Sequence, residues 1–64
     1  MEEKILRHLL ASLGEEIATN ASALQQGAPK TFDEYKYLCG VIRGLNLAQS
    51  YINDLMRKME QFDE

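Results

Sequence analysis

With 64 residues, the chain is long enough for one domain but too short to bury a large core, because a domain of this size covers only about 60% of the surface that its unfolded chain exposes. Hydrophobic residues make up 45% of the sequence and charged residues 27%, a composition that argues against disorder. The net charge of −3 and the seven scattered basic residues predict no nucleic-acid partner.

Small domains usually require a disulfide, a structural metal or association with another chain. Cys39 is the single cysteine and His8 the single histidine, so an intrachain disulfide is impossible and we expect no metal site and no cofactor. No apolar run approaches the roughly 20 residues that cross a bilayer, and the start MEEK lacks the features of a secretion signal. We therefore expect a soluble protein with no membrane partner, made in a cytoplasm and completed by association.

An amphipathic helix is predicted from Glu2 to about Gln25. Gly27 and Pro29 predict its end, because glycine adopts the left-handed conformation past a helix terminus and proline cannot continue the hydrogen-bond ladder. Its apolar residues recur at steps of three and four and form a stripe roughly 120° wide, which suits one packing partner: Leu6, Leu10, Leu13, Ile17, Ala21 and Leu24.

A longer helix of about eight turns is predicted from Phe32 to about Gln61. Thr31 can cap it, and Glu34 can accept a hydrogen bond from the backbone amide of Thr31. The link at about residues 26–31 is short and forces an antiparallel arrangement. The sequence therefore predicts an all-α fold for residues 1–64, a single antiparallel two-helix hairpin completed by oligomerisation or by docking to a larger protein.

The apolar residues of the second helix cover about 200° of its circumference, which is more than the first helix can cover. The remainder is either ordinary exposed surface or an interface, and contiguous apolar surface favours the interface. The second helix also overhangs the first, which leaves its last apolar residues without a partner in the chain. The predicted interface residues are Tyr37, Gly40, Val41, Gly44, Ala48, Tyr51, Leu55, Met59 and Phe62.

Gly40 and Gly44 lie within this helix, although each costs a helix interior about 1 kcal/mol relative to alanine. Together with Ala48 they recur at four-residue spacing, which predicts a shallow groove where another helix can approach closely. Two alternatives remain: the glycines lie over bulky side chains of the first helix, or they mark a kink.

Asn20 and Gln49 occupy positions where heptad spacing places core residues. Each is either a buried polar group that fixes register or, as we favour, an edge residue that bonds water. The helical rotation places Cys39 on the polar side of the second helix. No nucleophile and base, and no pair of carboxylates, share a face, so we expect no catalytic residue, no enzyme and no small-molecule substrate.

The segment YKYLCGVIRGLNLAQSYINDLMRKM, residues 35–59, carries a motif of aromatic, glycine, aliphatic and basic residues at fixed spacings. Its matching residues are Tyr35, Leu38, Gly40, Ile42, Gly44, Leu45, Ala48, Ile52, Asp54, Leu55, Arg57 and Lys58. This motif resembles small α-helical proteins encoded by tailed bacteriophages, and it departs from them at Cys39, where we expect valine or a similar residue. The resemblance implies a phage origin and a virion or assembly context, without a defined activity.

Together these observations predict a non-enzymatic helical interaction module. The resemblance places it as a phage virion structural or assembly protein that self-associates or packs on a larger capsid or connector protein. The alternative is a small intracellular regulator that binds and inhibits a host or phage enzyme. The expected location is the cytoplasm of the host cell during synthesis, with the virion as the later one.

Overall fold

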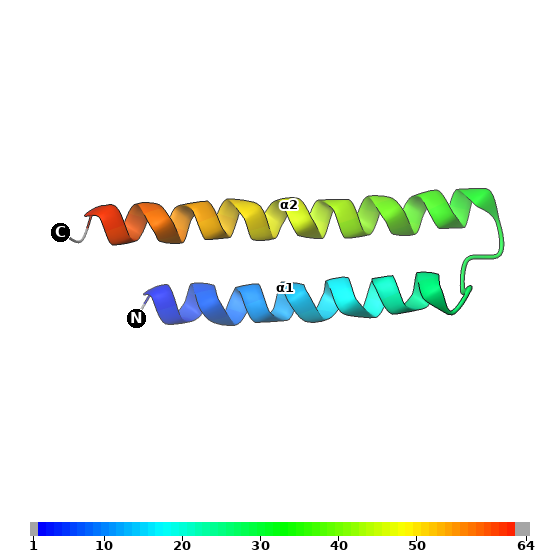
Figure 1. Ribbon diagram of the computed structural model, residues 1–64, viewed down its shortest axis with the longest axis horizontal. Coiled ribbons are helices and arrows are strands. Elements are labelled where there is room, and N and C mark those ends of the chain that lie inside the picture. Colours follow the sequence, from blue (N-terminus) through cyan, green and yellow to red (C-terminus); the bar gives the residue numbers. More distant parts are fainter. Residues whose placement is uncertain (1, 63–64) are drawn as a thin grey trace.

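Two helices form the whole of the structure, a computed structural model that describes the backbone of residues 2–62 and the side chains of residues 3–60. Helix α1 spans Glu2–Gln25 and helix α2 spans Phe32–Phe62. They lie side by side and run antiparallel (Figure 1), and no strand occurs within residues 2–62. The predicted all-α hairpin is confirmed.

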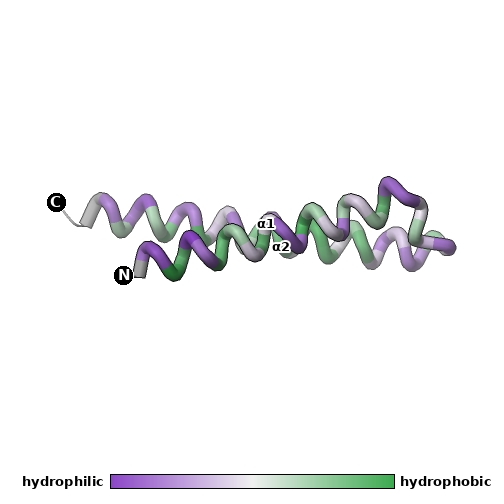
Figure 2. The backbone as a smooth tube through the Cα atoms, turned by 90° about the horizontal axis from the view of Figure 1, so that it is seen from below, coloured by the Kyte–Doolittle hydropathy of each residue, from purple (hydrophilic) through white to green (hydrophobic). Residues whose placement is uncertain are grey.

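The hairpin is long and thin, with extents of 51 × 15 × 12 Å and a radius of gyration of 15.0 Å, against about 10.7 Å for a compact domain of this length. Helix α2 extends past the start of α1 at the open end (Figure 1), and the two helices cross near their middles (Figure 2). Since each helix has only one neighbour, none of the side chains of residues 3–60 is buried.

A Schellman motif closes the end of α1. Gly27 adopts φ 77°, and its N–H donates to the carbonyl of Leu24 at 3.1 Å, while the N–H of Ala28 donates to the carbonyl of Ala23 at 3.0 Å. These bonds satisfy carbonyls that have no partner within the helix. Gly27 therefore ends α1 in the way that its sequence position predicts.

The start of α2 is capped by two side chains. Thr31 Oγ1 accepts a hydrogen bond from the N–H of Glu34 at 3.1 Å. In return, Glu34 Oε1 accepts from the N–H of Lys30 at 2.9 Å and not from Thr31, so the predicted partner of this carboxylate is wrong by one residue. The carboxylate still lies at the helix N-terminus, where the helix dipole favours negative charge.

Gln49 forms a hydrogen bond between the two helices. Its Nε2 donates to the carbonyl of Leu10 at 3.4 Å, and an ideal Cβ at Gly14 would lie 3.5 Å from the same nitrogen. Gln49 is half-buried between the helices, so the expectation of an edge residue bonded to water is wrong here. Asn20 is also half-buried but donates within its own helix, to the carbonyl of Glu16 at 2.8 Å.

We expect Gly27→Ala to lower the free energy of unfolding by about 1–2 kcal/mol, because a side chain makes the left-handed conformation costly. An ideal Cβ at Gly27 meets no atom within 4 Å, so the effect isolates the backbone. Gly27→Asn is the control and should cost less, since asparagine tolerates this conformation. Urea denaturation followed by circular dichroism measures both. An alanine variant as stable as the native chain would contradict the cap.

Candidate protein interface

Large apolar side chains are exposed on more than one side of α2. Phe32 is 71% exposed and Tyr35 49%, and rotation places both on the side away from Tyr37. Tyr37 is 73% exposed, Tyr51 69% and Leu55 48%. A rotation of 100° per residue places these three side chains within about 40° of one another around the helix. We call the surface that they form with the small residues between them the α2 flank: Tyr37, Gly40, Gly44, Ala48, Tyr51 and Leu55.

The two glycines of the flank face open space. An ideal Cβ built on Gly40 or on Gly44 meets no atom within 4 Å, apart from its own neighbouring backbone. The alternative in which they lie over side chains of α1 is therefore wrong. Helix α2 also continues through both positions without interruption (Figure 1). The glycines leave a strip of helix backbone without side chains between Tyr37 and Tyr51.

The other predicted interface residues lie nearer to α1 or at the end of the chain. Val41 and Met59 are half-buried, as is Ala48 within the flank, which places them where the flank meets the contact between the helices. The side chain of Phe62 lies outside the part of the chain whose side chains the structure describes.

Helix α1 contributes two further exposed apolar side chains, Ile5 at 63% and Leu9 at 44%. Rotation places both on the side of α1 opposite Gly14. Gln49 packs on Gly14, so these two residues lie on one face of the hairpin. Rotation places the α2 flank on the side of α2 away from Gln49. The flank therefore lies on the other face, which is also the face of Ile5 and Leu9.

Register then places Ile5 and Leu9 beside the later half of the flank. The pairing of Leu10 with Gln49 puts Leu9 at the level of Tyr51 and Ile5 at the level of Leu55. These two residues were missing from the predicted interface. Both lie beside the apolar stripe of α1 in the sequence, and periodicity does not say which face of the hairpin they share.

Charged residues occur at the ends of the flank. By helical rotation, Asp33 lies on the same side of α2 near its start and Lys58 lies there near its end. Between residues 34 and 57, every charged side chain of α2 is displaced from Gly44 by about 80° or more. The centre of the flank is therefore uncharged, and its two ends carry opposite charges.

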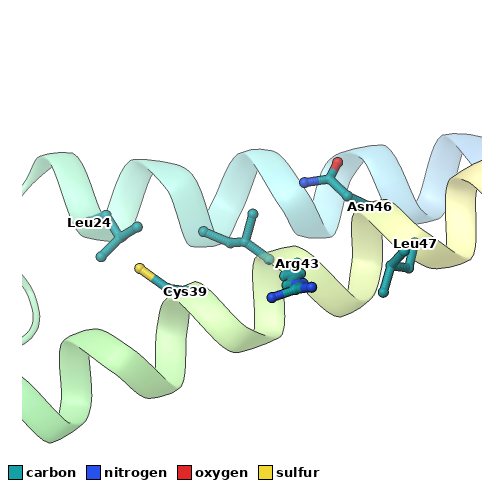
Figure 3. A pocket seen from close by; sticks show the side chains of 6 residues that line it. Leu24, Cys39, Arg43, Asn46 and Leu47 are labelled. Atoms are coloured by element: carbon teal, nitrogen blue, oxygen red, sulfur yellow. The ribbon is translucent and has the colours of Figure 1, made fainter.

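A shallow hollow lies between the helices near the loop. Figure 3 shows the side chains of Leu24 from α1 and Cys39 from α2 pointing toward one another. Cys39 is half-buried, and it lines the hollow together with Arg43 and Asn46. The hollow has one charged side chain, Arg43, among its described lining residues: Leu24, Cys39, Ile42, Arg43, Asn46 and Leu47.

Other kinds of site find little support in the described residues. Within residues 2–62, no three His, Cys, Asp or Glu side chains gather where they could hold a metal ion, and His8 is exposed. Neither α1 nor α2 is long and apolar enough to span a bilayer. No protein-family model, curated protein or solved structure matches the chain.

The pKa of the Tyr35 phenol is raised above its usual 10.0. The largest cause is hydrogen bonding with the Cys39 side chain, the second is the charge of the Cys39 thiolate, and the smallest is burial. The two residues are four apart and so lie on the same side of α2. Because the pKa in the folded state exceeds that in the unfolded state, the contribution to stability is present at neutral pH. It is lost as the pH rises through the folded-state pKa.

We expect Cys39→Ala to move the pKa of Tyr35 back toward 10.0, since its largest perturbing neighbour is removed. Titration followed by the ring 13Cζ resonance of Tyr35 measures this pKa. Cys39→Ser is the matched variant: it keeps a hydrogen-bonding hydroxyl but cannot form a thiolate, so its pKa should be intermediate. A Tyr35 pKa that is identical in the native chain and in Cys39→Ala would contradict the coupling.

Proposed function

We propose that the hairpin is a non-enzymatic interaction module and that the α2 flank is its binding surface. The observation that carries the proposal is the exposure of Tyr37, Tyr51 and Leu55 around a strip of open helix backbone. Exposed apolar surface that is contiguous over several turns is typical of protein interfaces. Tyrosine favours such a surface because it adds a large apolar area and loses little conformational freedom.

The total surface supports the same proposal. The chain exposes 5237 Å², which is about 1,000 Å² more than the roughly 4,200 Å² expected for a compact monomer of this mass. The excess arises because two helices cover each other along one line only. A partner on the α2 flank would remove part of it from water, with a gain of roughly 25 cal/mol for each Å² of apolar area.

The biological context that we propose follows the resemblance of residues 35–59. In it, the module is a phage virion structural or assembly protein that self-associates or packs on a larger capsid or connector protein. Mass spectrometry of purified particles tests this context. Many copies per particle support it, whereas abundance in infected cells with absence from particles favours the small regulator that binds and inhibits an enzyme.

Gly44→Leu tests the flank itself. The substitution should raise helix content, because leucine favours a helix over glycine by up to about 1 kcal/mol and the new side chain meets no obstacle at its Cβ within the hairpin. It should nevertheless abolish association, since the leucine fills the open strip. Circular dichroism measures helix content, and incorporation of the variant into purified particles measures association.

The control for this experiment is Ser50→Leu. Ser50 is exposed on α2, about 120° around the helix from Gly44, so the variant adds the same side chain away from the flank. We expect Ser50→Leu to be incorporated normally. If Gly44→Leu is incorporated as efficiently as Ser50→Leu, the α2 flank is not the binding surface.

A further inference from the structure

We propose that the partner of the α2 flank is a second copy of this chain, packed antiparallel about a two-fold axis that passes beside Gly44. This inference rests on the proposed function and names its partner. It uses four features of the described residues: the symmetry of the flank, its open centre, the charges at its ends and the area that remains exposed.

From Tyr37 to Tyr51, the flank has the same order of side-chain sizes in both directions from Gly44. Gly40 and Ala48 lie four residues before and after it, which is about 6 Å along the helix, and Tyr37 and Tyr51 lie seven residues away, about 10.5 Å. A two-fold axis between antiparallel helices brings each residue before Gly44 opposite the one equally far after it in the second copy. Small residues then face small residues, as a self-complementary interface requires.

The exposed tyrosines flank an open centre. Tyr37 and Tyr51 have nearly equal exposures, 73% and 69%, and apart from its own neighbouring backbone no atom of the hairpin lies within 4 Å of an ideal Cβ at Gly40 or Gly44. Two copies can therefore bring their backbones close at the centre. Tyr37 of one copy then packs beside Tyr51 of the other, once on each side of the axis.

The charges at the ends of the flank favour the antiparallel orientation. Antiparallel packing about Gly44 brings Asp33 near Lys58 of the second copy, with an offset of about 4.5 Å along the helix that a lysine side chain can span. Symmetry forms this pair twice. Parallel packing would instead place each of these residues beside its own like charge, and like charges select against an orientation even where exposed pairs add little affinity.

The exposed area matches one such partner. The surface beyond that of a compact monomer is about 1,000 Å², and a stable interface of standard size buries about 800 Å² on each partner. Each chain therefore has enough exposed surface to form one interface of standard size with a second hairpin. Ile5 and Leu9, which lie on the same face beside Tyr51 and Leu55, extend the apolar surface that the second copy can cover.

Two single-cysteine variants test the symmetry. Gly40→Cys and Ala48→Cys are each made in a Cys39→Ser background, mixed under reducing conditions, and then oxidised. The two-fold axis places position 40 opposite position 48, so the expected product is a disulfide between the two variants. Neither variant should crosslink with itself, because position 40 lies about 12 Å along the axis from position 40 of the second copy, beyond the roughly 7 Å that a disulfide allows between Cα atoms.

Sedimentation equilibrium of the native chain complements the crosslinking and should give twice the 7.3 kDa of one chain. Gly44→Leu should sediment as a monomer and Ser50→Leu as a dimer. Self-crosslinking of each variant without the mixed product would overturn the antiparallel arrangement. If the native chain stays monomeric and the two cysteine variants form no crosslink, the proposal that the partner is a second copy is wrong. The proposed function would still be decided by the incorporation of Gly44→Leu into particles.

Discussion

Two helices that have only each other as neighbours cannot enclose a side chain from every side, and most features of this hairpin follow from that constraint. No side chain of residues 3–60 is buried. The apolar stripe of α1 has the width that one neighbour can cover, whereas that of α2 is wider. The excess width of α2 is the surface that remains exposed, with Tyr37, Tyr51 and Leu55 as its largest members.

Because the shared contact is small, local interactions define where each helix ends. The left-handed Gly27 and the bonds around it close α1, and Thr31 with Glu34 begins α2. The caps act within one helix, whereas the bond from Gln49 to the carbonyl of Leu10 links one helix to the other. Exposed ion pairs such as Arg7 with Glu3, at 3.6 Å, contribute little.

Local signals explain why the hairpin was predictable from the sequence and why parts of the candidate interface were not. Periodicity and capping residues act over a few positions, so the helices, Gly27 and Thr31 could be recognised without tertiary information. The partial burial of Cys39, the partner of Gln49 and the face shared by Ile5 with Leu55 depend on the register and the sense of the helix pairing. Helical periodicity is the same for either sense, so these features required the structure.

Gly40 and Gly44 destabilise α2, and no contact within the hairpin compensates for them. Together they lower helix stability by about 2 kcal/mol relative to alanine, and nothing within the hairpin packs on them to offset that loss. At roughly 25 cal/mol for each Å², covering about 80 Å² of apolar surface offsets it, and a single tyrosine buries about 150–250 Å² when fully covered. A partner that covered half of Tyr37 or Tyr51 would therefore be enough to make two glycines favourable at the centre of α2.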